Sequence, residues 1–324
     1  MKEELRQEYD NLVEANSEVL KVYKPRKTKK FGIIAIFKVL SIMFIGFPLG
    51  LLLIMYMFLS IGFAETILLI AILLYFWCKK LIENTKRIKQ KYIENILKTL
   101  ILKLKFINSI SLDSKIPKEI YKIANFRQPQ YENYKGNNYL AGKIDNARIE
   151  MSNMWTTVTR TQITDGRETT YEKLVVEGFL IVATLENTIL DGYIHIFDDK
   201  DDSNIFKINI PENKVYMDYS LFEKNFDVYA TEPIKAVEIL TSDIMQRLID
   251  EKEKMGYKYD ITITKNKLIM RVWNRGNVLT LRGKSKSSYM YHEDLRDNLI
   301  DDLVFIDDAS KFINDLVNNI CSKQ

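Results

Sequence analysis

Cysteine and histidine are nearly absent from this sequence. Only Cys78 and Cys321 occur, which excludes a disulfide framework and a zinc cluster built on cysteine, and agrees with a cytoplasmic location. The two histidines are His195, which alternates with isoleucines in an apparent strand, and His292, which precedes two acidic residues. We interpret the first as a structural or surface residue and the second as an exposed residue at a helix start.

The motifs of common catalytic and cofactor sites are also missing. The sequence has no G-x-S-x-G and no cysteine signature for a nucleophile, and the GKS within WNRGNVLTLRGKSK lacks the earlier glycine of a phosphate-binding loop. The acidic turn FDDKDDSN lacks the glycine and the closing glutamate of an EF-hand. We interpret this turn, and the pairs Asp301-Asp302 and Asp307-Asp308, as solvated. The sequence predicts no cofactor and no metal, and the missing catalytic set argues against an enzyme without deciding the question.

Charged residues are scarce between positions 31 and 78, where only Lys38 and Glu65 occur. Residues 39–64 are 26 positions without a charge, and a helix needs ~20 apolar residues to cross a hydrocarbon core of ~30 Å. The whole run fits two helices joined by a short turn. Lys38 can reach the basic interface, and Glu65 falls in the outer half of the second helix. We therefore predict a transmembrane hairpin.

Both flanks of this run are strongly basic. Residues 21–30 hold six basic residues and no acid, and residues 79–105 hold nine against two acids. The formal net charge is only +4, so the rest of the chain carries −9. Basic flanks attract anionic headgroups and stay on the cytoplasmic side, whereas nucleic-acid binding favours a basic folded domain. We expect an inner (plasma) membrane protein with two helices across the bilayer, both termini cytoplasmic, and no nucleic acid.

Helical periodicity occurs on both sides of the hairpin and again at the end of the chain. An amphipathic arm is expected over residues 2–20, with its apolar stripe on the helix that follows the hairpin or on a partner subunit. A basic linker helix follows from residue 79 to about 108, and either a coiled-coil seam or docking on the domain explains its apolar spacing. A short helix is expected around residues 116–124, with Pro117 in its first turn. The C-terminal helix is expected over residues 294–320, with a break at Asp307-Asp308.

Beyond residue 130 the pattern alternates with a period of two, as in half-buried strands. Short connections favour an antiparallel meander. The expected strands are residues 139–144, 148–152, 155–163, 172–185, 190–197, 226–230, 258–264 and 267–273, with edge pieces at 205–210 and 214–217. LVVEGFLIVAT (174–184) is the most apolar of them, so we expect it at the centre, with Gly178 at a bulge or a close crossing. Thr231 and Thr241 are the expected N-caps of two helices, the second of which ends near Gly256.

Three stretches carry a resemblance to a known family: YLAGKIDNARIEMS, VVEGFLIVAT and FEKNFDVYATEPIKAVEILTSDIMQRLIDEKEK. With the NKLIM strand that follows, they resemble an uncharacterised bacterial family of two-helix membrane-anchored proteins with a C-terminal domain of unknown function (the FDVYAT-type motif). The resemblance covers residues 80–320 and implies no catalytic residues. It implies proximity to another envelope membrane protein, of the LemA-like kind.

The sequence thus predicts an α+β fold: a transmembrane helical hairpin, a long linker helix, and a cytoplasmic antiparallel sheet flanked by helices. The boundaries are 1–30 for the arm and basic flank, 31–78 for the hairpin, 79–126 for the linker and 127–324 for the domain. The expected role is an interaction or scaffolding module that binds a copy of itself or another membrane protein; the alternative is an enzyme acting on a membrane lipid or envelope precursor. Contact with lipid headgroups is expected at Lys79, Lys80, Arg275, Arg282, Lys284 and Lys286.

Overall fold

The computed structural model describes residues 1–15, 72, 75–77, 79–80, 94–164, 167–198, 213–273, 275, 278–279 and 292–321. The chain divides into two compact units: Met1–Gln7 with Leu97–Gln324, and Glu8–Ile96. The expected hairpin at 31–78 lies outside the described residues except at positions 72 and 75–77. Among the described residues, no helix is both long and apolar enough to cross a membrane.

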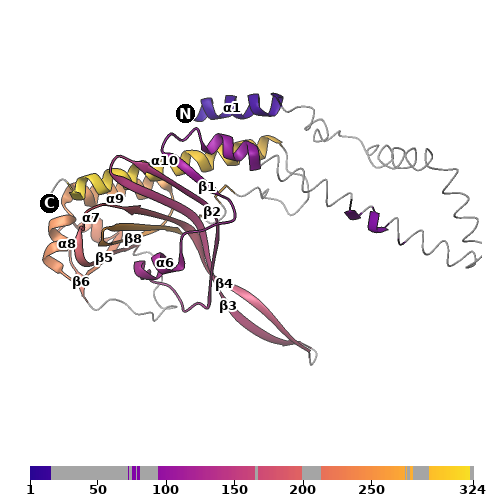
Figure 1. Ribbon diagram of the computed structural model, residues 1–324. Helices are drawn as coiled ribbons and strands as arrows, with labels where there is room; N and C mark the ends of the chain where they lie inside the picture. The colour runs from indigo at the N-terminus through magenta and orange to yellow at the C-terminus, as the bar shows by residue number, and fades with distance from the viewer. Residues whose placement is uncertain are drawn as a thin grey trace, which may run out of the picture. The chain divides into compact units, whose positions relative to one another are not determined.

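Nine described strands of the first unit form one antiparallel sheet (Figure 1), so the predicted α+β class is confirmed for this unit. The strand order is β1-β2-β3-β4-β9-β8-β5-β7-β6. The strands are β1 (Ile107–Ser111), β2 (Asn133–Ile144), β3 (Ala147–Thr164), β4 (Arg167–Thr184), β5 (Leu190–Asp198), β6 (Lys214–Val215), β7 (Phe226–Ala230), β8 (Tyr259–Lys265) and β9 (Lys267–Trp273).

The predicted meander holds for β2, β3 and β4. β1, at the edge beside β2, is not among the predicted strands. The hairpin of β8 and β9 is inserted between β4 and β5, so β5 pairs with β8 and β7 and not with β4. The second half of β4 is fully buried from Phe179 to Ala183, and such a strand needs an apolar neighbour on each side. β9 supplies that neighbour because Leu268, Ile269 and Met270 are themselves fully buried.

Gly178 lies where β4 and β9 come closest. A Cβ added there would lie 2.5 Å from the carbonyl oxygen of Val272, so only glycine fits without a shift of the backbone. β4 is an interior strand between β3 and β9. The prediction of a close approach at Gly178 is therefore confirmed, whereas the middle position of the nine described strands belongs to β9 and not to β4 as predicted.

β3 is a single strand of 18 residues where the sequence predicts two strands, 148–152 and 155–163. Asn153 lies between the two predicted strands and still pairs with Phe179 of β4 and with Asn137 of β2, although the β2 register shifts just after Asn137. The side-chain amide of Asn153 instead donates to the carbonyl of Val278 and accepts from the N–H of the same residue, at 2.8 and 2.9 Å. The polar residue is a side-chain anchor for another segment, which is why it does not end the strand.

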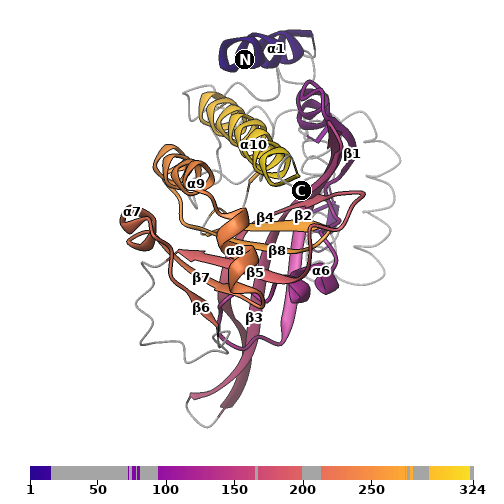
Figure 2. The ribbon, with the colours of Figure 1, turned by 90° about the vertical axis from the view of Figure 1, so that its left-hand side faces the viewer.

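Helices cover both faces of the sheet. α9 (Ser242–Met255) and α10 (His292–Cys321) lie on one face, and α6 (Lys118–Ala124) lies on the other (Figures 1 and 2). The short helices α7 (Ser220–Glu223) and α8 (Pro233–Ile239) flank β7. On the α9 side, the hydroxyl of Tyr259 donates to the carbonyl of Leu248 at 2.5 Å. Because side chains alternate along a strand, Asp260 and Thr262 of β8 point to the α6 side.

The first turn of α1 (Lys2–Ala15) contacts α10. Lys2 pairs with Asp301 at 2.7 Å, and Arg6 pairs with Asp297 at 3.6 Å. Leu5 is buried, which gives this turn a hydrophobic contact as well as two exposed ion pairs.

The predicted break in the C-terminal helix is wrong, since α10 continues through Asp307 and Asp308. The Ser310 hydroxyl donates to the carbonyl of Asp307 at 2.7 Å, and Lys311 pairs with the Asp307 carboxylate at 2.6 Å. These contacts, one of them at the favourable i, i+4 spacing, satisfy the polar groups without ending the helix.

The sequence predicts the N-caps of two helices after the FDVYA strand, and one of the two predictions is confirmed. α9 has Thr241 as its N-cap and Gly256, with a φ of 66°, as its C-cap, as predicted. α8 instead has Glu232 as its N-cap. Thr231 does not cap it because its hydroxyl accepts the N–H of Tyr193 at 3.0 Å and so ties the end of β7 to β5.

The described helical residues before the sheet end at position 101, and β1 begins at Ile107. The end of this helix and the strand β1 both lie in residues 79–126, which the sequence assigns to the linker. The linker helix is expected to reach about residue 108, so the structure ends it earlier. α6 lies within the short helix expected over residues 116–124, which is confirmed. The linker segment therefore supplies an edge strand and a covering helix to the sheet.

Candidate functional site

The α6 side of the sheet carries the largest group of buried polar side chains that the structure describes, and we take it as the candidate site. α6 ends at Asn125, whose φ of 44° is left-handed, so the chain turns back over the sheet after this helix. Thr262 of β8 donates its hydroxyl to the carbonyl of Ala124 at 2.7 Å. Tyr134 of β2 donates to the carbonyl of Ile116 at 3.0 Å. Two strands thus hold the two ends of the α6 segment by hydrogen bonds.

Arg271 of β9 is at the centre of this group and is fully buried. Its Nη2 atom lies 2.6 Å from Oδ2 of Asp260 on β8 and 3.0 Å from the carbonyl of Arg127. Its Nη1 atom donates to the Tyr121 hydroxyl at 3.0 Å and to Oε1 of Gln128 at 3.2 Å. Three of these four contacts link β9 to α6 and the loop that follows it, and the fourth joins β9 to β8.

Two aromatic rings enclose the guanidinium. Its central carbon lies 4.5 Å from the ring centroid of Phe126 and 4.0 Å from that of Trp273, within the range of a cation–π interaction. The indole N–H of Trp273 also donates to Oδ2 of Asp260 at 2.7 Å. The Asp260 carboxylate therefore accepts hydrogen bonds from both Arg271 and Trp273, which joins the three side chains in one network.

The electrostatics of this cluster indicate a structural role. Burial raises the pKa of the Asp260 carboxyl, and the charge of Arg271 opposes that rise. Burial also raises the pKa of Tyr121, so its phenol stays protonated. An arginine whose terminal nitrogens already bind protein groups offers nothing to a substrate. We conclude that the cluster fastens α6 to the sheet.

His195 lies on the same side of the sheet, in β5. Its Nδ1 atom is 2.9 Å from the hydroxyl of Thr262. That hydroxyl already donates its only proton to Ala124, so it accepts from Nδ1, and the neutral ring carries its proton there. Burial lowers the pKa of His195 to about 4, so the ring is uncharged near neutral pH.

The ring of His195 stacks between other aromatic side chains of β5. Its centroid is 4.4 Å from that of Tyr193 and 5.4 Å from that of Phe197. Nε2 is buried, and no described residue gives it a hydrogen bond. No serine, cysteine or carboxylate contact is recorded for it among the described residues, so the ring has no nucleophile to activate. The interpretation of His195 as a structural histidine agrees with this geometry.

The structure describes three of the six residues that are expected to contact lipid headgroups. Lys79 and Lys80 are exposed, and Arg282, Lys284 and Lys286 lie outside the described residues. Arg275 is partly buried: it pairs with Asp302 at 2.9 Å. Its guanidinium carbon also lies 5.1 and 4.9 Å from the ring centroids of Tyr257 and Phe305. The structure thus gives Arg275 partners within the protein.

The interpretation of the acidic pairs and of the FDDKDDSN turn as solvated is wrong for three residues: Asp198 and Asp307 are buried, and Asp302 is partly buried. Asp199, Asp201 and Asp202 lie outside the described residues. Asp198 pairs with Lys252 at 3.0 Å, and Asp308 lies 3.5 Å from Lys254. Among the described residues, no group of three or more histidine, cysteine or acidic side chains could hold a metal ion.

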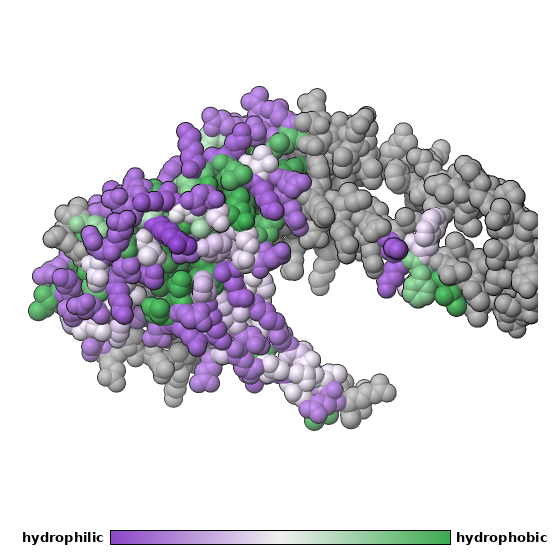
Figure 3. Space-filling view, viewed as in Figure 1, coloured by the Kyte–Doolittle hydropathy of each residue, from purple (hydrophilic) through white to green (hydrophobic). Residues whose placement is uncertain are grey.

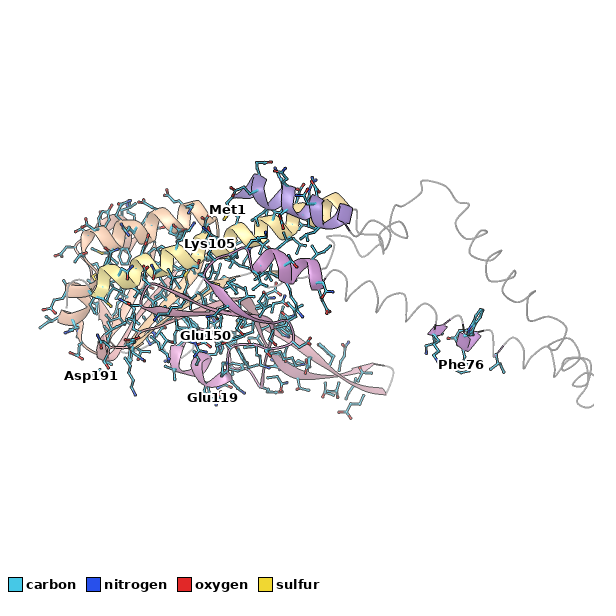
Figure 4. The ribbon with its side chains drawn as sticks, turned by 45° about the horizontal axis from the view of Figure 1, so that its top comes forward. Met1, Phe76, Lys105, Glu119, Glu150 and Asp191 are labelled. Atoms are coloured by element: carbon cyan, nitrogen blue, oxygen red, sulfur yellow. The ribbon has the colours of Figure 1, made fainter. Side chains whose placement is uncertain are left out.

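One exposed group of apolar side chains stands directly before the two exposed lysines. Ile72, Tyr75, Phe76 and Trp77 are all exposed, Tyr75 and Phe76 to 65% and 60%. The rings of Tyr75 and Phe76 meet edge to face, with centroids 5.7 Å apart. Figure 4 labels Phe76 on its short helical turn. Aromatic residues followed by lysines are typical of the boundary between a bilayer and water.

Comparison with known families gives one match. A domain described as a protein of unknown function (DUF3137) covers residues 175–306. The DUF3137 match extends from the buried half of β4 into α10, and so includes Asp260, Arg271 and His195. It leaves out α6 and the loop that supplies Tyr121 and Gln128 to the cluster. The expectation of a C-terminal domain of unknown function is confirmed to this extent.

Two further comparisons add little. No curated protein matches the chain. Among solved structures, the chain is similar to the crystal structure of the mycobacterial trehalose monomycolate transport factor A, TtfA, with 8% sequence identity and a TM-score of 0.34 over 69% of this chain and 93% of that one. A TM-score this low supports no conclusion about fold or function.

The Arg271 cluster was not predicted from the sequence. A signal for it exists in KLIMRVW and YDITITK. Apart from a lysine at one end, each strand has one charged residue among apolar or β-branched ones, and these two charges, Arg271 and Asp260, are of opposite sign. Two such strands joined by a two-residue turn form a hairpin, in which opposite charges at cross-strand positions pair. Asp260 and Arg271 are direct partners in this register. The contribution of α6 has no comparable sequence signal, because it depends on how a separate segment packs.

Proposed function

We propose that this chain is a membrane-anchored protein whose sheet domain acts as an interaction or scaffolding module on the cytoplasmic side of the inner membrane. The anchor is the apolar run at 31–78, and the domain is built on the sheet that contains the DUF3137 match.

One observation carries the proposal: the exposed group of Ile72, Tyr75, Phe76 and Trp77 next to Lys79 and Lys80. Exposing large apolar side chains to water costs ~25 cal/mol for each Å² of apolar surface. A lipid boundary removes this cost, because the rings enter the headgroup region while the lysines bind the phosphates. We extend the headgroup contact to Arg282, Lys284 and Lys286, whereas Arg275 is held by Asp302 in the structure.

The ion pairs of the buried carboxylates favour an interaction role over an enzymatic one. Asp198, Asp227, Asp260 and Asp302 each lie within 4 Å of a lysine or arginine. The alternative, an enzyme acting on a membrane lipid or envelope precursor, needs carboxylates that converge on a substrate with room for it. No described feature favours that alternative.

The membrane topology is tested by cysteine labelling in intact cells. Ser60 is expected at the outer turn of the hairpin, and Cys321 is exposed on α10. In a Cys78→Ser background, a membrane-impermeant maleimide should label a Ser60→Cys variant from outside, and should label Cys321 only after the membrane is opened. Labelling of Cys321 in intact cells, or extraction of the chain from membranes by alkaline carbonate, would contradict the proposal.

The interaction role is tested separately. Purification of the tagged chain from native membranes in mild detergent should recover it with a stoichiometric partner, which is either another envelope membrane protein or a second copy. A solitary monomer across several detergents would rule out a scaffolding role while leaving the membrane anchor in place.

A further inference from the structure

The outer ends of β3 and β4 form a two-stranded ribbon that leaves the sheet (Figures 1 and 2). β2 pairs with β3 only as far as Thr157, and β9 pairs with β4 only from Gly178 onward. Between these limits, residues 158–164 pair with residues 167–173 and with no other described strand. The ribbon therefore has two open edges.

An isolated two-stranded ribbon is only marginally stable in water. The side chains of this one do little to support it, because Ile163 and Tyr171 are 74% and 48% exposed. In Figure 3 the ribbon is mostly hydrophilic or intermediate in hydropathy, so the face shown there is not a continuous apolar surface. Pairing at an edge is the contact that would stabilise it.

The two edges differ in composition. The β3 edge reads VTRTQIT (158–164): five of its seven residues are β-branched, Arg160 is its one charge, and it has no proline, glycine or lysine. The β4 edge reads RETTYEK (167–173) and carries four charges. Charged side chains are a common protection of open edges against pairing. The β3 edge is the less protected of the two and has the higher strand propensity.

Glu132 shows which backbone groups of β3 face this edge. β2 begins at Asn133, and the Glu132 carboxylate just before it accepts the N–H of Thr159 at 3.0 Å and its hydroxyl at 2.5 Å. The N–H of Thr159 therefore points to the outer edge. Because the direction alternates along a strand, the N–H and C=O groups of Thr161 and Ile163 point the same way.

We propose that a second copy of this chain pairs with the β3 edge, antiparallel and centred on Thr161, so that the two ribbons form a four-stranded sheet. Thr161 then faces Thr161 of the partner subunit, and their N–H and C=O groups bond reciprocally. The N–H of Ile163 meets the C=O of Thr159 of the partner subunit, which Glu132 leaves free. The inference rests on the proposed interaction role and names its partner.

Charge and symmetry select this register. With Thr161 at the centre, Arg160 faces Gln162 of the partner subunit, and threonine faces threonine, which is a favourable cross-strand pair. A shift that centres the pairing on Arg160 sets two arginines directly opposite each other, which is unfavourable. Pairing of identical edges also closes after two copies, whereas pairing of a β3 edge with a β4 edge continues into an open chain.

Disulfide formation tests the pairing in native membranes, using the full chain with Cys78→Ser and Cys321→Ser. Thr161→Cys is the test variant, and Thr170→Cys is its control, because Thr161 and Thr170 are exposed cross-strand partners on the same ribbon. In the proposed dimer the two Thr161 Cα atoms are ~5.5 Å apart, the spacing of a hydrogen-bonded antiparallel pair, which a disulfide spans. The two Thr170 positions are three strand spacings apart, ~14 Å, which it does not.

We expect mild oxidation to convert most of the Thr161→Cys chain into a covalent dimer and to leave Thr170→Cys monomeric. No dimer from Thr161→Cys, equal dimer formation by both variants, or a disulfide to a different protein would each overturn the inference. Membrane fractionation of the same samples keeps the two proposals separate: a chain that stays in the membrane but does not cross-link refutes the dimer alone.

A second pair of variants tests the edge without a covalent bond. Thr161→Lys places two like charges opposite each other in the proposed dimer, and Thr170→Lys adds the same charge one strand away from the contact. Sedimentation of the purified chain in detergent should show at least a ~10-fold weaker dimer for Thr161→Lys, which corresponds to ~1.4 kcal/mol. Dimers of unchanged strength in Thr161→Lys would contradict the assigned edge.

Discussion

Arg271 and Asp260 form an ion pair inside the sheet domain, with 2.6 Å between Nη2 and Oδ2 and with side chains exposed by 0% and 4%. The two residues are direct cross-strand partners in β9 and β8. Burying two charges is costly, and the cost is recovered only if each has good geometry and further hydrogen bonds. The further bonds of Asp260 come from Trp273 and the N–H of Asp198, whereas those of Arg271 come from α6 and the loop after it. The bonding of Arg271 is therefore complete only when α6 is docked.

Replacing Asp260 by asparagine should strongly destabilise the fold. The change keeps the size of the side chain and an acceptor for the Trp273 indole but leaves the Arg271 charge buried without a counter-charge. Breaking a buried pair in this way typically costs ~3–5 kcal/mol. Urea unfolding of the full chain in detergent, followed by far-ultraviolet circular dichroism, should show the midpoint fall by the corresponding amount.

The double variant Asp260→Leu with Arg271→Met is the matched control for this prediction. It removes both charges and keeps the volume, so it should lose less stability than Asp260→Asn alone. A double variant less stable than the single one would show that the polar bonds to Tyr121 and Arg127, and not the unpaired charge, dominate the cost.

His195 should make the fold sensitive to acid. Its pKa is lowered to about 4 by burial, against ~6.5 in an unfolded chain. The unfolded state therefore binds the proton first as the pH falls. The stability contributed by the neutral ring is complete above about pH 6.5 and is lost progressively as the pH falls towards 4, up to ~3 kcal/mol.

The test compares the pH dependence of unfolding in His195→Gln with that in His292→Gln, the variant of the other histidine. Carboxyls whose pKa burial raises, such as Glu251, favour the folded state as the pH falls and oppose the histidine effect, so only a comparison between variants isolates it. His195→Gln should lose the acid-dependent destabilisation between pH 6.5 and 4, and His292→Gln should keep it. Identical profiles for the two variants would refute the assignment.

Burial should contribute more than ion pairing to the contact between the start of α1 and α10. Leu5 is buried to 4% exposure, whereas Lys2 and Asp301 are 48% and 56% exposed in their ion pair. Leu5→Ala should therefore cost ~2–3 kcal/mol, at the lower end for a large-to-small change in a core. Lys2→Ala should cost at most ~0.5 kcal/mol. Thermal unfolding of the two variants measures both, and equal losses would contradict the argument.

The sequence predicts the strands of this fold better than their order. FDVYA, the β8–β9 hairpin and α9 follow local rules of alternation, turn and capping, and all three occur where those rules place them. The insertion of β8 and β9 beside β4 depends on which buried strands fit together, which no local pattern encodes. The same holds for the site: Asp260 and Arg271 stand out in their strands, but their enclosure by Phe126 and Gln128 depends on the packing of α6.

Asn153 explains a part of the fold that local rules also miss. Its side chain binds both backbone groups of Val278, and Asn138 donates to the same carbonyl at 2.9 Å. Next to it, the Leu279 N–H donates to Asp302 at 2.7 Å. Val278 and Leu279 are both buried, so a dipeptide of the chain after β9 is fixed to the sheet by side chains of β2, β3 and α10.

Asn153→Ala should release this dipeptide without unfolding the sheet. It leaves the N–H of Val278 without its acceptor, and an unsatisfied buried group costs ~1–3 kcal/mol. Hydrogen exchange at Val278 and Leu279 should then accelerate ~10-fold or more, while exchange in β4 and β9 stays slow. Asn137→Ala is the control, because Asn137 bonds Asn153 at 2.8 Å but has no recorded bond to Val278. Equal acceleration in both variants would mean that the dipeptide is held by its apolar side chains and not by Asn153.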